Sequence, residues 1–165
     1  MATSLSVSVD IDKDVDTVFN AITDGDYIKQ KLETNGARNI NVKSSGANGT
    51  SANLVYTREE PADVPSALKK FISEWNELTN TDNWSGTAGD SYSCNYEVDM
   101  GGGPIKVGGT HTLEPNGSGG TTSTINMDIS CGVPLLGKKI EQFVAGLSKK
   151  GLQDDVDFQK SFLDG

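Results

Sequence analysis

VPLLGKKIEQFVAGLSKKGLQDDVDFQKSFL, residues 133–163, is the stretch that decides the fold. No proline follows Pro134, and the larger apolar residues recur every three or four positions, which predicts one amphipathic helix from roughly Leu135 to Leu163. The residues on this predicted stripe are Leu136, Ile140, Phe143, Val144, Leu147, Gly151, Phe158 and Phe162. Such a helix is about 40 Å long, so it needs a large surface to lie on, and the upstream chain must supply that surface.

Length and charge narrow the class of protein. The 165 residues suit one domain over 1–165, which is long enough to bury a core. The formal net charge of -9, with scattered acidic residues, disfavours binding to nucleic acid or to an anionic membrane. No segment approaches the roughly 18 apolar residues of a membrane span, and the first ten residues lack a secretory signal. We therefore expect a cytoplasmic protein.

The rest of the chain is predicted to form mainly strands. Residues 4–11 alternate between apolar and polar side chains, which predicts a strand with one buried face. Asp14 is suited to cap a short helix that begins near Val15, and a second short helix is expected over Asp26–Leu32. Further strands are predicted over 37–44, 51–58, 74–81 (weak), 91–100, 105–114 and 124–133, with a helical turn at 66–72.

This order of elements predicts an α+β fold. A curved antiparallel sheet of about six to seven strands has one apolar face, and that face needs a cover. Only the C-terminal helix is large enough to provide it, with the two short helices following the first strand. The sequence therefore predicts a sheet wrapped around the long C-terminal helix.

Several short motifs in this chain occur in an order that marks a resemblance. They are Trp84, Gly103-Pro104, Gly108-Gly109, Gly119-Gly120-Thr121 and residues 133–141 at the start of the long helix. With the element order, they resemble the helix-grip fold of the START-like (SRPBCC, Bet v 1-like) superfamily, which includes Bet v 1 allergens, polyketide cyclases and lipid-transfer domains. The chain is most similar to a bacterial START-like family of unknown function. The resemblance implies a ligand cavity between sheet and helix, and it brings no catalytic residues.

His111 is the one histidine, and it falls on the apolar face of its strand. If the turn after Met100 pairs that residue with Ile105, Cys94 lies opposite His111. Such a pair could activate a thiolate for nucleophilic catalysis. No third group that would orient the imidazole is visible in the sequence. We therefore favour the interpretation of His111 as part of a cavity wall.

We expect neither a metal nor a cofactor. In the same pairing scheme Cys131 lies about 20 Å from His111, which is too far for one ion to bridge. That distance also argues against a disulfide between Cys94 and Cys131. The carboxylate pairs Asp10/Asp12 and Asp154/Asp155 are interpreted as solvated groups at element ends, because no calcium-loop pattern surrounds them.

The ligand-binding residues predicted from these patterns lie on the inner faces of the strands and on the helix stripe. They are Tyr56, Tyr92, Cys94, Tyr96, His111, Met127, Ile140, Phe143, Val144, Leu147 and Gly151. Tyrosine combines an apolar ring with a polar tip, which suits a pocket that fixes a ligand through one or two hydrogen bonds. Gly151 removes bulk from the stripe, which leaves room for a ligand or allows close packing.

Three functional hypotheses follow from the sequence. The first is noncatalytic binding of a small hydrophobic or amphipathic molecule, lipid or polyketide-like, by a monomer or weak homodimer. The second is a cyclase or hydratase that uses His111 as general base and a tyrosine as acid. The third is an interaction module that works through its exposed sheet face, although the serine- and threonine-rich outer faces argue against it.

Overall fold

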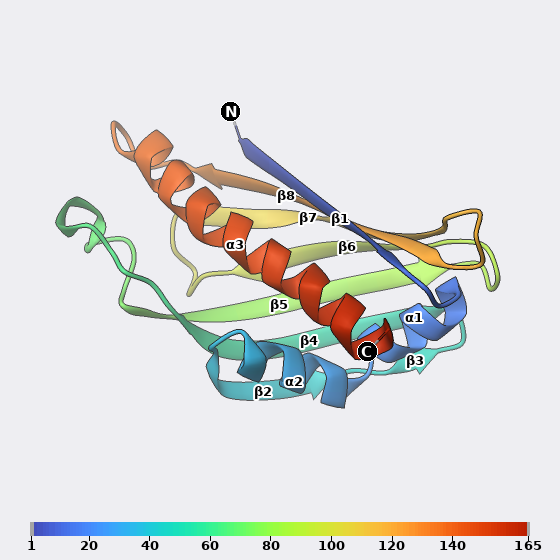
Figure 1. The fold of residues 1–165 in the computed structure, drawn as a ribbon. Coiled ribbons are helices and arrows are strands. Elements are labelled where there is room, and N and C mark those ends of the chain that lie inside the picture. Colours follow the sequence, from blue (N-terminus) through green and yellow to red (C-terminus); the bar gives the residue numbers. More distant parts are fainter. Residues whose placement is uncertain (1, 165) are drawn as a thin grey trace.

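An eight-stranded antiparallel sheet curves around one long helix in the computed structural model, which describes residues 2–164 (Figure 1). The helices are α1 (Val15–Ile22), α2 (Gly25–Thr34) and α3 (Gly137–Asp164), with a short 3-10 turn at Ser66–Leu68. The strands are β1 (Thr3–Ile11), β2 (Arg38–Ser44), β3 (Ala47–Asn48), β4 (Ser51–Pro61), β5 (Trp75–Gly86), β6 (Tyr92–Asp99), β7 (Ile105–Pro115) and β8 (Thr121–Cys131). This architecture confirms the α+β helix-grip prediction.

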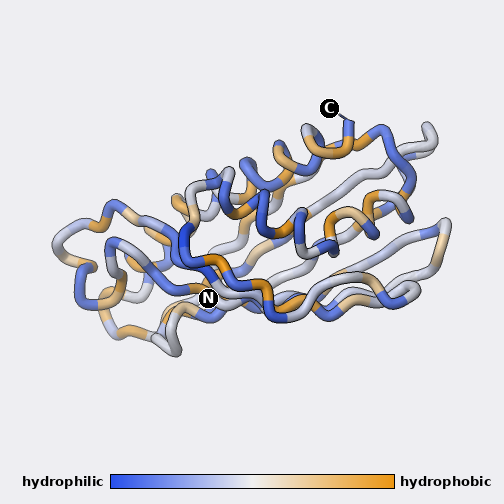
Figure 2. Tube along the Cα trace, turned by 90° about the horizontal axis from the view of Figure 1, so that it is seen from below, coloured by the Kyte–Doolittle hydropathy of each residue, from blue (hydrophilic) through white to orange (hydrophobic). Residues whose placement is uncertain are grey.

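The strand order is β1-β8-β7-β6-β5-β4-β2, and β3 pairs with β4. Every step from β4 to β8 joins neighbours in sequence, while β1 pairs with β8 at the far edge. The register confirms that Cys94 lies opposite His111 and that Ile105 lies opposite Cys131. Figure 1 shows α3 running diagonally across one face of the sheet, with α2 beside it near β2. Figure 2 shows the helices on one side of the sheet, with hydrophobic and hydrophilic segments alternating along their coils.

The short helices begin where the sequence predicts. The backbone N–H of Thr17 donates to the carboxylate of Asp14 at 2.8 Å, which caps the N-terminus of α1. In the same way Asp24 accepts from the N–H of Asp26 and caps α2. Phe19 of α1 is completely buried in the core at the end of the sheet. The helix therefore packs in the core directly after its capped first turn.

Strand β5 is longer than the predicted weak strand over 74–81. It runs to Gly86, and its inner face carries Asn80, Asp82 and Trp84. Two polar residues at buried positions break the alternation by which a half-buried strand is recognised. The buried polar residues Asn80 and Asp82 therefore made the second half of β5 hard to predict from the sequence.

Helix α3 begins at Gly137, two residues later than predicted. Leu135 has a φ of 67°, in the left-handed region, so the helix cannot include it. The predicted stripe is also partly wrong, since Leu147 and Phe162 are 42% and 44% exposed. The buried residues of α3 are Gly137, Ile140, Glu141, Val144, Ala145, Leu152, Val156 and Gln159. Prediction from apolar residues alone missed the buried polar members.

Glu141 joins the first turn of α3 to β1 and β8, the two neighbouring strands at one edge of the sheet. Its carboxylate accepts from the hydroxyl of Thr3 at 3.0 Å and from the backbone N–H of Cys131 at 3.1 Å. A carboxylate that is 4% exposed needs such partners, because an unpaired buried charge is costly. The contacts fix α3 at the start of its path across β8 and β1.

Tyr96 crosses the middle of the sheet above Gly109. The two residues are paired in the β6–β7 register, and the Tyr96 hydroxyl donates to the carbonyl of Asn126 on β8 at 2.8 Å. A β-carbon at Gly109 would collide with that same carbonyl. Glycine therefore allows close approach here, and the Tyr96 ring covers the gap it leaves.

Candidate ligand cavity

A cavity of about 420 Å³ lies between the sheet and the helices α2 and α3. Its size is within the range that is typical of small-molecule sites. The apolar part of its wall is drawn from all of these elements and includes Ile28, Leu32, Leu54, Leu78, Trp84, Val98, Val107, Ile125, Met127, Val144 and Leu152. Two apolar clusters adjoin the cavity, one built around α1 and α2 and the other around the first half of α3 and residues 62–72, and Leu5, Val98 and Met127 pack against both.

Eight of the eleven residues predicted to bind a ligand line this cavity. They are Tyr56, Cys94, Tyr96, His111, Met127, Val144, Leu147 and Gly151. A β-carbon at Gly151 would have no atom within 4 Å, so the missing side chain leaves open space and does not serve close packing. The alternation of each strand was sufficient to place the sheet residues on the inner face.

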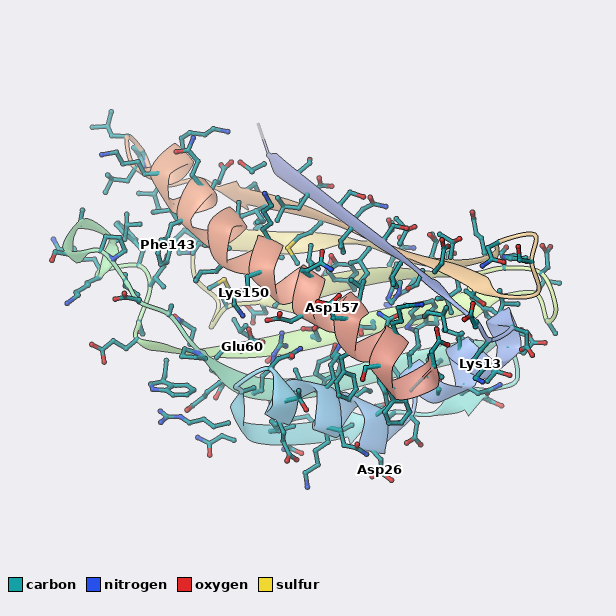
Figure 3. All side chains as sticks on the ribbon, in the orientation of Figure 1. Lys13, Asp26, Glu60, Phe143, Lys150 and Asp157 are labelled. Carbon is teal, nitrogen blue, oxygen red and sulfur yellow. The ribbon has the colours of Figure 1, made fainter. Side chains whose placement is uncertain are left out.

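The other three predicted residues lie elsewhere. Tyr92 stacks on Phe19 with ring centroids 4.0 Å apart, and its hydroxyl donates to Asp16 at the α1 end of the sheet. Ile140 is fully buried in the second cluster. Phe143 packs against the same cluster, and Figure 3 shows it on the side of α3 toward residues 62–72. All three point inward, but into packed regions beyond the ends of the cavity.

His111 has an orienting partner that the sequence did not reveal. Its Nε2 lies 2.7 Å from the hydroxyl of Ser123, and that hydroxyl donates to Oε1 of Gln159 at 2.8 Å. With the Ser123 hydrogen directed to Gln159, Nε2 must donate and Nδ1 is left as the acceptor. Nδ1 forms no hydrogen bond with any part of residues 2–164. Burial, and to a lesser extent Lys31, lowers the pKa of His111 to about 3, so the imidazole is neutral.

Cys94 and His111 are paired in register, yet they form no hydrogen bond among the described residues. Burial raises the pKa of the Cys94 thiol, and the nearby Asp82 raises it further. The same burial lowers the pKa of His111. Because both groups are shifted toward their neutral forms, the thiolate–imidazolium pair needed for nucleophilic catalysis is disfavoured.

A buried polar network on β4 and β5 is the largest feature that the sequence interpretation missed. The Tyr56 hydroxyl and the Asn80 amide both donate to Asp82, at 3.2 and 3.0 Å. Arg58 donates through Nη1 to Asn80 and through Nε to Glu60, the latter at 2.7 Å. Burial raises the pKa of Asp82 despite these donors. The signal available was polar residues at every second position, 56-58-60 and 80-82, on otherwise inward faces.

A second polar row faces the cavity from α2. Tyr27, Lys31 and Asn35 are spaced by four and therefore lie on one side of the helix, opposite Asp155 of α3. Asn35 donates to Asp155 at 3.1 Å, and the Lys31 ammonium lies 3.8 Å from its other oxygen. Asp155 is therefore paired, although 29% of its side chain stays exposed. Burial raises the pKa of this carboxyl against the opposing effect of Lys31, because its accessible surface faces the cavity.

The cavity opens between α3 and the end of β4. Figure 3 shows Glu60 and Lys150 on the side of α3 that faces α2 and β4, and both residues line the cavity together with Leu147 and Gly151. Lys150 is paired with Asp154 at 2.8 Å, one turn along the helix. Charged side chains therefore border an opening that leads to a mainly apolar interior.

The described part of the chain contains neither a metal-binding cluster nor a membrane-spanning helix. Residues 2–164 contain no group of three or more histidine, cysteine or acidic side chains that could hold a metal ion. None of their helices is both long and apolar enough to cross a bilayer.

Comparison with known proteins gives one family match and several similar structures. The pattern of the family described as "Protein of unknown function (DUF2505)" matches residues 6–163. A search of curated proteins gave no match. The Zhui aromatase/cyclase from Streptomyces sp. R1128 is similar with a TM-score of 0.72 at 9% identity, over 99% of this chain and 94% of that one.

Two further solved structures are similar over nearly the whole chain. TTHA0849 from Thermus thermophilus has a TM-score of 0.68 at 12% identity, covering 96% of this chain and 95% of that one. The human StarD13 (DLC2) lipid transfer and protein localization domain has a TM-score of 0.60 at 13% identity, covering 98% and 77%. At these identities the similarity shows the fold alone, and it confirms the predicted helix-grip fold.

Proposed function

This chain belongs to the DUF2505 family, a family of unknown function, and from its cavity we propose that it binds a small hydrophobic or amphipathic molecule without transforming it. The observation that carries the proposal is the cavity of about 420 Å³ between the sheet and α3. Removing apolar ligand surface from water in such a space is worth about 25 cal/mol per Å². The lining polar groups would then set the ligand's orientation.

The names of similar structures support the ligand-binding part of this proposal. Two of the similar structures are an aromatase/cyclase and a lipid transfer domain, and each of these names implies a small-molecule ligand. We favour binding over catalysis because the thiol of Cys94 and the imidazole of His111 are both held neutral by burial. Neither is prepared to act as a nucleophile or as a strong base.

A matched pair of substitutions on α3 tests whether ligands enter the cavity. Ser148 is half-buried and lines the cavity, whereas Ser161 is exposed on the same helix. We expect Ser148→Phe to fill part of the space and to weaken binding of the uncharged dye Nile red by about tenfold or more, since about 1.4 kcal/mol of lost binding free energy suffices. Ser161→Phe should bind the dye as the wild type does, as followed by its fluorescence.

Comparison with the control variant Ser161→Phe also shows which result would contradict the proposal. If both variants bind Nile red as tightly as the wild type, the dye lies outside the cavity and the proposal is wrong. Native mass spectrometry of protein purified from its host gives an independent readout, because a bound molecule adds mass that denaturation removes. Ser148→Phe should lack that adduct, and Ser161→Phe should retain it.

A further inference from the structure

The hydrogen-bonding capacity that remains unused in the cavity is mainly that of donors on α2. The Lys31 ammonium lines the cavity and forms no hydrogen bond within residues 2–164, since its nearest carboxylate oxygen, on Asp155, is 3.8 Å away. One turn earlier, the hydroxyl of Tyr27 is buried and has no partner in the same range. A buried donor without a partner is costly, so an acceptor brought by a ligand would complete this row.

The carboxylates of the cavity, in contrast, already have partners. Glu60 accepts from Arg58, and Asp154 pairs with Lys150. Asp82 accepts from two donors, and Asp155 accepts from Asn35. Each carboxylate of the wall therefore already has at least one partner within the protein. The wall offers donors to an oxygen atom.

The charge balance decides what kind of oxygen fits. The lining residues include three basic and four acidic side chains, a formal net charge of -1. Burial raises the pKa of the carboxyls of Asp82 and Asp155 and lowers the pKa of His111, so the cavity disfavours charge of either sign. A ligand carboxylate would add a further anion to this environment. A carbonyl oxygen satisfies the same donors without adding charge.

One acceptor in the cavity is also free. Nε2 of His111 donates to Ser123, so Nδ1 carries no hydrogen and can only accept. Nδ1 has no hydrogen-bond partner among residues 2–164. A neutral imidazole acceptor is suited to a hydroxyl donor on a ligand. The hydroxyl hydrogen of Tyr96 is already directed to the backbone of β8, so this hydroxyl offers a ligand no donor.

Building on the binding role above, we propose that the ligand is an uncharged, oxygenated hydrophobic molecule with a carbonyl oxygen for Lys31 and a hydroxyl group for His111. This class excludes free fatty acids and amines as preferred ligands. It includes aromatic hydroxyketones and similar molecules of a size that the cavity can enclose.

A series of naphthalenes that differ in one group tests this proposal by calorimetry at pH 7.5. The reference probe is 6-hydroxy-2-acetylnaphthalene. Its partners replace the acetyl group with ethyl, carboxylate or aminomethyl, or remove the hydroxyl. We expect the hydroxyketone to bind about 3- to 10-fold more tightly than the ethyl analogue and than 2-acetylnaphthalene, as one hydrogen bond each would give. The carboxylate and the amine should bind at least about tenfold more weakly than the hydroxyketone.

Two lysines on α2 provide a matched pair of variants. Lys31→Met keeps an apolar stem but removes the ammonium, while Lys29→Met alters a lysine whose side chain is 63% exposed. In Lys31→Met the ketone should lose its advantage over the ethyl analogue, and both should still bind. In Lys29→Met the advantage should be unchanged. A general structural effect of Lys31→Met would instead weaken both probes equally.

The outcomes separate this inference from the binding role on which it rests. If all five probes bind with equal affinity, or if the carboxylate or the amine binds most tightly, the ligand class is wrong and the cavity role stands. If none of the probes binds, the cavity role itself fails and the inference fails with it. If Lys31→Met leaves the ketone preference intact, Lys31 is not the donor and the proposal is overturned.

Discussion

His111 couples the free energy of unfolding to pH. Its pKa is about 3 in the folded protein, against 6.5 without burial, so the unfolded chain binds the proton more readily. The stability that this group contributes is full above pH 6.5 and is lost as the pH falls toward 3. Between pH 8 and pH 5 the wild type should therefore lose about 2 kcal/mol through this residue.

The variant His111→Gln isolates that effect, because glutamine can still donate to Ser123 but does not titrate. Urea unfolding at pH 8 and pH 5 should show a smaller acid loss for the variant by about the same 2 kcal/mol. Equal losses in the two proteins would mean that His111 is not held neutral by burial.

At the level of single residues, the sequence predicts the pairing of residues on two strands that one tight turn connects. The pairing of Cys94 with His111 follows from the position of a single tight turn, and it is correct. The partners of His111 could not be found in this way. Ser123 and Gln159 come from β8 and α3, and only the packing of the helix on the sheet brings them together. Hydrogen bonds between elements depend on a register that sequence periodicity does not contain.

Helix α3 carries two glycines that test its packing. Neither Gly146 nor Gly151 would place a β-carbon within 4 Å of another atom, but only Gly151 lines the cavity. Alanine at either position should raise the free energy of unfolding by about 0.5–1 kcal/mol, because it restricts the unfolded chain and favours the helix.

Urea unfolding of Gly146→Ala and Gly151→Ala checks this pair. Similar gains are expected, since a methyl group at Gly151 points into open space. If Gly151→Ala alone loses stability, the position packs more closely than the structure indicates, and its role in opening the cavity is wrong.

At the level of elements, periodicity identified most strands and failed where polar residues occupy buried positions. Strand β5 was shortened in the prediction because Asn80 and Asp82 occupy buried positions that normally carry apolar residues. The stripe of α3 was shifted for the same reason, as Glu141 and Gln159 are buried with hydrogen-bond partners. Polar residues at buried positions remove the pattern from which a buried face is predicted.

For the whole molecule, ligand binding should appear as thermal stabilisation. A ligand present at about a hundred times its Kd adds about 2.7 kcal/mol to the folded state. For a protein of this length that corresponds to a rise in Tm of about 5 to 10 °C. The probe 6-hydroxy-2-acetylnaphthalene should produce this shift in the wild type and in Ser161→Phe.

The blocked variant provides the control. Ser148→Phe should show little change in Tm at the same probe concentration, because the side chain occupies the space that the ligand needs. An equal shift in Ser148→Phe would place the stabilising site outside the cavity.

The whole architecture was predictable from the sequence to a greater extent than its interior. Element order and the motif at residues 133–141 were sufficient for the helix-grip fold. The polar network of Tyr56, Arg58, Asn80 and Asp82 was not foreseen, since each residue resembles an ordinary polar side chain of a strand until its neighbours are known.

The pairing of β1 with β8 has a consequence for the order in which the protein is made. Thr3 leaves the ribosome early, but its partner Ile129 follows more than a hundred residues later. Strands β4 to β8 can pair successively as they emerge, whereas the first strand must wait for the last, and the concave face stays uncovered until α3 is complete. Long-range closure of this kind slows folding and prolongs the exposure of apolar surface. The apolar concave face of the nascent chain is therefore exposed to solvent until α3 has formed and packed against the sheet.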